Sequence, residues 1–220
     1  MGVSAAQGSA GLKPGVCTST TRPSNPFEGQ MIYETDTDLS YIYNGSSWQQ
    51  VSGGTAVGNS GLVYITSATI GTGVSTVEVL SAFNTTYDAY KIVATGVTGA
   101  TGAESISMTL GNSGGYTSTG YDSGMIFNLA GTAVVANGNA SAWNFVGAYS
   151  TTTGMPLNID VYSPFAAHPT SFSSVYMRAD AYGTPTGTLT GTTSYDRFTI
   201  TVVAGTITGG TIAIYGYRKA

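Results

Sequence analysis

Apolar and polar residues alternate with a period of two along much of this chain, the pattern of half-buried β-strands. Between residues 30 and 51 this alternation predicts three short strands, Gln30–Glu34, Leu39–Asn44 and Trp48–Val51. The TDTD and NGSS segments between them are turn signals, so the three strands should form a meander. No window shows the i, i+3, i+4, i+7 apolar spacing of an amphipathic helix, and the sequence therefore predicts an all-β protein.

Both faces of the expected meander carry apolar side chains. Period-two spacing places Met31 and Tyr33 on one face of the first strand and Ile32 on the other. Tyr41 and Tyr43 share one face of the second strand. A sheet this small is marginal in water without something to pack against. We therefore expect it to pack against the larger domain or against sister copies of itself.

A larger group of strands follows a Gly/Ser-rich segment of the flexible-linker type. Turn-forming Gly, Asn and Thr residues separate ten strand segments, with one pair that could be a single strand. We expect these segments to form a β-sandwich of jelly-roll type. The expected strands are Leu62–Ile70, Ser75–Leu80, Ala89–Val97, Ser105–Leu110, Gly124–Leu129, Trp143–Tyr149, Leu157–Tyr162, Ser173–Ala181, Arg197–Val203 and Thr211–Tyr217.

The N-terminal residues are expected to form an extended arm without regular structure. Pro14, Pro23, Pro26 and several glycines disfavour helices and strands there. The expected organisation is an arm at 1–28, a meander at 29–51, a linker at 52–61 and a sandwich head at 62–220.

Charged residues are scarce, at 8% of the chain, against roughly 25% in an ordinary soluble domain. Only three lysines are available to protect the edges of sheets. We therefore expect other copies of the chain to cover those edges in a homo-oligomer, with a monomeric Ser/Thr-surfaced sandwich as the alternative. The basic residues form no stripe that could follow a phosphate backbone, which argues against nucleic-acid binding.

The sequence carries no signal for membrane insertion or secretion. The longest apolar runs are far shorter than the roughly 20 residues that span a bilayer. The N-terminus lacks a basic stretch followed by an apolar one, so no signal peptide is expected. The single cysteine, Cys17, excludes an intrachain disulfide. These features fit a chain made in a cytoplasm.

Few groups could carry catalysis, and we expect no enzyme activity and no cofactor. Ser113 is central in a G-x-S-x-G segment, but no helix follows, which favours a hairpin end over a nucleophile elbow. His168, the only histidine, precedes Pro169 and is typical of a loop. Asp88 and Asp196 occur in similar Tyr-Asp contexts before strands. They indicate strand-entry turns, with two acids meeting in a cleft as the alternative.

Two further sets of side chains could bind ligands. Glu34, Asp36 and Asp38 alternate through the first turn and indicate solvated turn acids, with a Ca²⁺ site of oxygen ligands as the alternative. Tyrosines beside Gly-rich loops indicate core or interface packing, with stacking on sugars as the alternative. These tyrosines are Tyr116, Tyr121, Tyr149 and Tyr182.

The segment TRPSNPFEGQMIYETDTDLSYIYNGSSWQQV, residues 21–51, resembles a module that recurs in virion structural proteins of tailed bacteriophages. That module has an R-P-x-x-P stretch, a G-Q-x-I-Y-x-T-D-T strand and turn, an aromatic strand, an Asn-Gly turn and a Trp strand. The segments YDAYKIVATGV and GTITGGTIAIYGYRKA resemble, more loosely, the C-terminal jelly-roll heads of such proteins, notably from cyanophages and other marine phages. The match to the module is carried by Arg22, Pro23, Pro26, Gly29, Gln30, Ile32, Tyr33, Thr35, Asp36, Thr37, Tyr43, Asn44, Gly45 and Trp48.

The resemblance implies a tail-fibre, head-fibre or capsid-decoration protein, usually a homotrimer, that assembles in the host cytoplasm and becomes part of the virion. Residues 1–51 would then contact sister chains and other virion proteins, on the tail or the capsid. The residues expected at this oligomer or attachment interface are Arg22, Ile32, Tyr33, Tyr41, Tyr43 and Trp48.

The exposed head would attach to a host surface, with a cell-surface glycan as one ligand, or reinforce the shell. The sequence lacks the repeats of a long fibre shaft, which leaves a short appendage or a capsid decoration open. Three alternatives remain: a carbohydrate-binding or depolymerising tail protein, a capsid cement protein without a receptor role, and a cytoplasmic scaffold absent from the finished particle.

Overall fold

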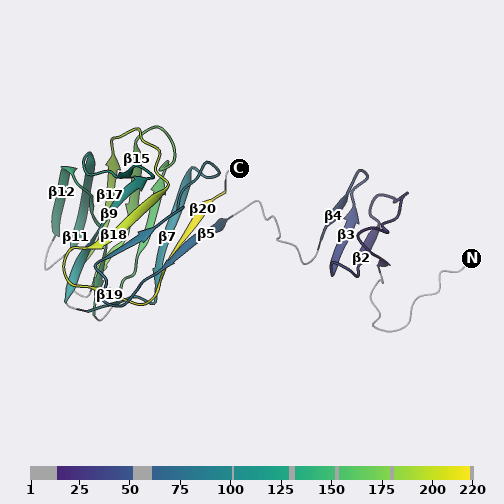
Figure 1. Cartoon of the computed structure of the whole chain (residues 1–220), viewed down its shortest axis with the longest axis horizontal. Helices are drawn as coiled ribbons and strands as arrows, with labels where there is room; N and C mark the ends of the chain where they lie inside the picture. Colours follow the sequence, from purple (N-terminus) through teal and green to yellow (C-terminus); the bar gives the residue numbers. More distant parts are fainter. Residues whose placement is uncertain are drawn as a thin grey trace, which may run out of the picture. The chain divides into compact units, whose positions relative to one another are not determined.

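The computed structural model describes residues 14–51, 61–100, 102–128, 132–151, 154–178 and 181–218. The chain divides into two compact units, Met1–Gly58 and Asn59–Ala220, which we call the module and the head. Figure 1 shows that the regular elements of both units are strands, which confirms the expected all-β fold. Among the described residues, no helix has the length and apolarity needed to cross a membrane.

The module is one four-stranded sheet in the order β1-β2-β3-β4. The three expected strands of the meander are present, and the Asn-Gly turn between the last two is closed by Asn44, whose side-chain oxygen accepts the Ser46 and Ser47 N–H groups. The strands are β1 (Gly15–Cys17), β2 (Met31–Glu34), β3 (Leu39–Tyr43) and β4 (Trp48–Gln50).

The expectation that residues 1–28 lack regular structure is wrong for β1. This strand pairs in parallel with β2, with Cys17 opposite Glu34. The Cys17 carbonyl accepts the Thr35 N–H at 2.9 Å and so extends the pairing. A three-residue strand whose paired residues lie 17 positions later has no local signal, because its stability comes from the ladder hydrogen bonds of that distant partner.

The head is a sandwich of two packed sheets (Figure 1). The large sheet has nine strands along the order β12-β11-β17-β15-β14-β7-β20-β5, with β16 also paired to β17. The small sheet has five strands, β10-β9-β18-β6 with β13 paired to β9. The β-sandwich is therefore confirmed, and its assignment to the jelly-roll type stays a prediction.

The strands of the large sheet are β5 (Leu62–Thr69), β7 (Ala89–Thr95), β11 (Tyr121–Asn128), β12 (Thr132–Ala140), β14 (Asn158–Tyr162), β15 (Thr170–Ser174), β16 (Tyr176–Arg178), β17 (Ala181–Leu189) and β20 (Thr211–Tyr217). Those of the small sheet are β6 (Thr76–Val79), β9 (Ala103–Asn112), β10 (Gly115–Tyr116), β13 (Trp143–Ser150) and β18 (Arg197–Val202). A separate two-stranded ribbon joins β8 (Thr98–Gly99) to β19 (Ile207–Thr208).

A large hydrophobic core lies between the two sheets, and a smaller separate cluster is formed by Met125, Ala148, Tyr176 and Ala181. Alternate residues of each strand point inward, as in β7, where Tyr90 and Ile92 are fully buried between half-exposed neighbours. Aromatic contacts cross the sandwich: Trp143 of the small sheet lies 4.7 Å, between ring centroids, from Phe172 of the large sheet. Burying each large side chain contributes roughly 1.5–3 kcal/mol, so these rows hold the sheets together.

Nine of the ten expected strand segments of the head match an observed strand closely, and Ser173–Ala181 is wrong. That stretch contains the end of β15, all of β16 and the first residue of β17. The GTPTG segment, residues 183–187, falls between two of the expected strands and lies inside β17. Pro185 fits there because β15 pairs with β17 up to Thr186 and β16 begins to pair at Gly183, so Pro185 faces the break between them.

Candidate functional site

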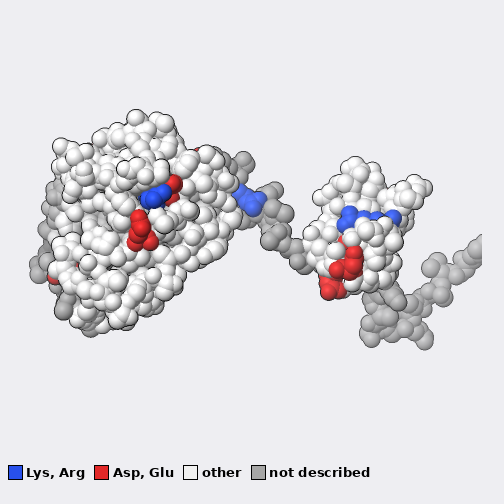
Figure 2. Space-filling view, in the orientation of Figure 1, with Lys and Arg blue, Asp and Glu red and all other residues white. Residues whose placement is uncertain are grey.

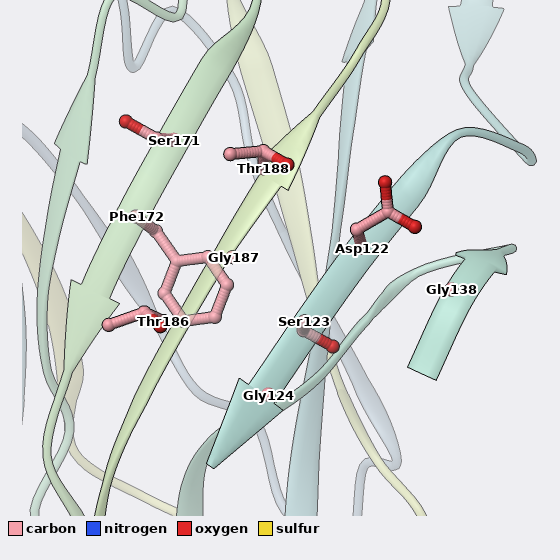
Figure 3. Close-up of a pocket in the computed structure, with 9 residues that line it drawn as sticks. All are labelled: Asp122, Ser123, Gly124, Gly138, Ser171, Phe172, Thr186, Gly187 and Thr188. Atoms are coloured by element: carbon pink, nitrogen blue, oxygen red, sulfur yellow. The ribbon is translucent and has the colours of Figure 1, made fainter. Parts of the chain in front are cut away.

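The outward face of the large sheet contains a shallow hollow over β11, β15 and β17. Its volume is about 590 Å³. Figure 3 shows the hollow, with hydroxyl and carboxylate groups at its surface. The groups that a ligand would meet are those of Asp122, Ser171, Thr186 and Thr188, which are exposed or half-exposed.

Two glycines, Gly124 and Gly187, contribute to the shape of this hollow. Gly124 stands opposite Thr186 on the outward face, where it presents no side chain. Gly187 lies beneath the hollow, and a Cβ there would meet Phe172 Cε1 at 2.6 Å. Phe172 is only 2% exposed and fills the core side of the sheet at this point. Gly187 therefore allows β17 to lie close to both the Asp122 carbonyl of β11 and the Phe172 ring, and Gly124 leaves a depression on the surface above.

A second hollow of about 240 Å³ lies further along β11 and β17. Ile126 and Tyr182, which help to line it, are 63% and 61% exposed. The Tyr182 hydroxyl accepts a hydrogen bond from the Asn128 side-chain amide at 3.1 Å. This bond holds the tyrosine ring on the surface next to the hollow.

For two of the four candidate tyrosines the structure confirms core packing and excludes the ligand-facing alternative. Tyr121 and Tyr149 are 0% exposed and belong to the core. The Tyr121 hydroxyl accepts the Leu110 N–H at 2.7 Å, and burial raises the pKa of this hydroxyl above its ordinary value. The Tyr149 hydroxyl donates to the Ala204 carbonyl. Their positions next to Gly-rich loops reflect strands that begin or end at the core rather than at the surface.

Tyr116 lies on the surface of the small sheet, at the hairpin of β9 and β10. Its hydroxyl donates to the Glu78 carboxylate, and burial, followed by this hydrogen bond, raises the Tyr116 pKa above its ordinary value. The positive charge of Arg197 acts in the opposite direction on the Tyr116 pKa. Arg197 also forms an ion pair with Asp196, with Nε 2.6 Å from Oδ1. Tyr116 is therefore a surface residue held by its neighbours, on a different sheet from Tyr182.

In the module, Arg22 and Glu34 form an internal clasp. The Arg22 guanidinium Nε donates to Glu34, and the guanidinium carbon lies 4.4 Å from the centre of the Tyr41 ring. The hydrogen bond from Arg22 lowers the pKa of Glu34 below its ordinary value. The Glu34 side chain is 0% exposed, so this acid is not a solvated turn residue. Thr37 completes the arrangement, because its hydroxyl donates to Glu34 Oε2 at 2.9 Å.

The expected interface residues of the module divide between its two faces. Ile32 is 1% exposed and lies inside the module, so its assignment to an interface is wrong. Register pairs place Tyr41 opposite Ile32, and Tyr43 opposite Trp48, on the same side as the clasp. The Tyr43 and Trp48 ring centroids are 5.4 Å apart. These three aromatic residues are half-buried within the module itself.

The other face of the module sheet is rich in apolar side chains, with Ser40 and Gln49 beside them, and the described residues 14–51 leave it partly exposed. Val16 pairs with Tyr33, and Met31 pairs with Ile42, so these four side chains share one face. Val16 and Met31 are 58% and 49% exposed, and Tyr33 and Ile42 are half-buried. We call this set, Val16, Met31, Tyr33 and Ile42, the open face. Of its members, sequence reasoning placed only Tyr33 at an interface, because β1 had no signal that would bring Val16 there.

The three turn acids of the module have different partners. Asp36 accepts the Ser19 N–H at 2.9 Å and the Ser19 hydroxyl at 2.6 Å, and Asp38 accepts the Tyr33 hydroxyl at 2.7 Å. The hydroxyl of Ser19 lowers the pKa of Asp36 below its ordinary value. Among the described residues, no three His, Cys, Asp or Glu side chains come together as metal ligands do.

Among the described residues, the candidate catalytic side chains do not come together in one site. Ser113 lies in the tight hairpin between β9 and β10, as its glycine-rich context predicted. The His168 ring Nδ1 lies 3.2 Å from the Pro169 carbonyl on an exposed loop. Asp88 lines a hollow of about 200 Å³ whose described lining does not include Asp196.

Comparison of the chain with known protein families, with curated proteins and with solved structures finds no significant match. The function is therefore inferred from the geometry described above and from the sequence.

Proposed function

We propose that this protein is a non-enzymatic structural component of a tailed-phage virion, a short trimeric appendage on the tail or the capsid. The module would join three chains to one another and to the particle. The head would be exposed for attachment to a host surface or for reinforcement of the shell. The resemblance of residues 21–51 to virion modules suggests this role, and the open face is the single observation that carries it.

Burial of the open face against another chain would stabilise the module. Four apolar side chains on one side of a four-stranded sheet are a large fraction of so small a unit. Completing the burial of Val16 and Met31, each about half exposed, would contribute roughly 1.5–3 kcal/mol per chain. Identical modules around a symmetry axis present the same face to one another and leave no chain uncovered.

The surface of the head also favours an assembly. On the face shown in Figure 2, the charged residues of the head are few, most of them lie in one small group of both signs, and the surface around this group is uncharged. The strands at the two edges of the large sheet, β5 and β12, contain no Lys, Arg, Asp or Glu. Isolated proteins usually protect such edges with charges or prolines, so uncharged edges favour close neighbours in a particle.

The non-enzymatic part of the proposal is supported by the partners of two of the described acids. Glu34 and Asp196 are engaged in ion pairs with Arg22 and Arg197, which lower the pKa of both carboxyl groups. An acid held by a cation has its charge stabilised, which disfavours a role as a proton donor near neutral pH.

A charge on the open face tests this proposal. Met31→Asp should dissociate the trimer to monomers and remove the protein from purified virions, because a carboxylate cannot be buried unpaired between modules. Asn25→Asp adds the same charge at an exposed position outside the open face and is the matched control. Sedimentation gives the mass, and mass spectrometry of purified virions gives the incorporation. A Met31→Asp variant that stays trimeric and enters virions would contradict the proposal.

A further inference from the structure

The two hollows on the outward face of the head lie one after the other along β11 and β17, and we call the surface that contains both of them the track. Residues that pair across these strands face outward together, in the order Asp122 with Thr188, Gly124 with Thr186, Ile126 with Thr184, and Asn128 with Tyr182. Successive pairs are two residues apart, so the four pairs extend over about 20 Å. The first hollow lies at the Asp122 end and the second at the Tyr182 end.

The chemistry of this track is that of an uncharged, hydroxyl-rich ligand. Threonine hydroxyls occupy three successive outward positions of β17, namely Thr184, Thr186 and Thr188. Each hydroxyl can donate one hydrogen bond and accept two, which suits ligands that carry hydroxyl groups of their own. The Asn128 amide adds a group that can both donate and accept.

An aromatic ring and a shallow shape complete the pattern. Tyr182 is 61% exposed, and its hydroxyl is held by Asn128 at one side, so the ring is fixed on the surface. A fixed aromatic ring gives a large contact area at low cost in conformational entropy. The track is open along its length, so it fits a chain lying on the sheet better than a small molecule enclosed in a pocket.

Charge restricts the class of ligand. Among the described residues that line the two hollows, Asp122 is the one charged side chain. A carboxylate without a basic residue beside it repels uronic-acid, sulfated and phosphorylated polymers. The same argument excludes nucleic acid, which needs basic side chains along its backbone.

We propose that the track along β11 and β17 binds an extended, neutral oligosaccharide, with Tyr182 as the stacking platform and Thr184, Thr186, Thr188 and Asn128 as hydrogen-bonding groups. This inference deepens the proposed attachment role of the head and depends on it for its biological setting. Asp122 selects against anionic sugars.

Titration of the full chain with hexasaccharides of equal length tests the binding. The neutral probes are cellohexaose, maltohexaose and mannohexaose, and the anionic probe is a hexamer of alginate. We expect at least one neutral probe to bind, and the alginate hexamer not to bind. Tyr182→Ala should weaken binding at least tenfold, and Thr186→Trp, which fills the first hollow, should abolish it. Tyr162→Ala is the matched control, because Tyr162 is 42% exposed on the same sheet but lies on β14.

Asp122→Asn tests the selection by charge. It keeps the oxygen that accepts the Asn139 N–H at 2.7 Å and removes the negative charge. We expect this variant to retain the neutral probe and to gain measurable affinity for the alginate hexamer. The proposed binding site would be contradicted if none of the neutral probes bound. It would also be contradicted if wild type, Tyr182→Ala and Thr186→Trp bound them equally.

These outcomes are distinguishable from failure of the proposed function. Tyr182 and Thr186 lie in the head, so their variants should keep the trimer mass and enter virions. A trimeric protein present in virions that binds no neutral probe would refute the track alone. A protein absent from virions would refute the proposed function, whatever the head binds.

Discussion

Tyr121 connects the two sheets of the head through its hydroxyl, which accepts the Leu110 N–H and donates a longer bond to the Leu110 carbonyl, and removal of this hydroxyl has a calculable cost. Tyr121 begins β11 in the large sheet, and its hydroxyl accepts the N–H of Leu110, in β9 of the small sheet, at 2.7 Å. Val203 donates its N–H to the Ser105 carbonyl, so the hydrogen-bonded pairs between β9 and β18 fall on the odd-numbered residues of β9. The Leu110 N–H therefore points away from β18, towards the tyrosine.

Tyr121→Phe should lower the free energy of unfolding of the head by about 1–3 kcal/mol, the cost of leaving a buried N–H without its acceptor. The ring itself stays, so its contact with Trp143, at 5.5 Å between centroids, is kept and no cavity forms. In a unit of this size each kcal/mol lowers the midpoint of thermal unfolding by about 2–4 °C.

Urea unfolding followed by near-ultraviolet circular dichroism measures this change, because Trp143 and its neighbours are buried aromatic residues of the head. Tyr182→Phe is the matched control: it removes the same atom from a tyrosine that is 61% exposed, and should change the free energy by less than about 0.5 kcal/mol. Equal values for the two variants would refute the assignment of Tyr121 as a connection between the sheets.

Three further predictions concern packing, alkaline pH and acid pH. Gly187→Ala should destabilise the head by roughly 1–3 kcal/mol in urea unfolding, because its Cβ would meet Phe172. Gly114→Ala, whose Cβ meets only the Asn112 side chain, should change the free energy of unfolding little. Equal effects of the two variants would contradict the close packing beneath the hollow. Burial and the hydrogen bond to Asp160 raise the Tyr217 pKa from 10.0 to about 12, so its contribution is present below pH 10 and is lost as pH rises towards 12. Tyr217→Phe should therefore show a smaller loss of stability between those pH values, and an unchanged slope would contradict it. The pKa of Glu34 is lowered by the Arg22 hydrogen bond, so the module should lose stability as pH falls below the ordinary carboxyl range; Arg22→Met should unfold at higher pH than wild type by the NMR signal of the Trp48 indole, and equal midpoints would contradict the clasp.

The strands that alternate clearly could be predicted from the sequence. Period two and a flanking turn signal located β7, β18 and β20, where buried and half-exposed residues alternate as expected. The hairpin at Ser113 followed from its glycines and is present. In these segments the local preference of the residues agrees with the packing of the whole domain.

Elements that depend on distant partners could not be predicted. In β17, Gly183 and Gly187 look like turn residues, yet each is required because a neighbouring strand leaves no room for a Cβ. The strand β1 exists through its pairing with β2, and Tyr121 is buried through its bond to β9. No local pattern records such contacts, because tertiary packing overrides the preference of a short segment.

The sequence indicated part of the track on the head. Tyr182, Thr184, Thr186 and Thr188 alternate with a period of two, which is the pattern of an outward row on a strand. Pro185 and the two glycines between them concealed the strand, so Tyr182 was found as a candidate without its neighbours. The pairing of β17 with β11, and with it Asp122 and Asn128, came only from the structure.

The mass of the full-length chain in solution tests the central claim, that identical chains cover one another through the module. Sedimentation equilibrium, at concentrations from micromolar upward and at physiological salt, should give three times the chain mass of 22.4 kDa. The Met31→Asp variant should give the mass of one chain under the same conditions. A wild-type protein that sediments as a single chain over the whole range would contradict the account.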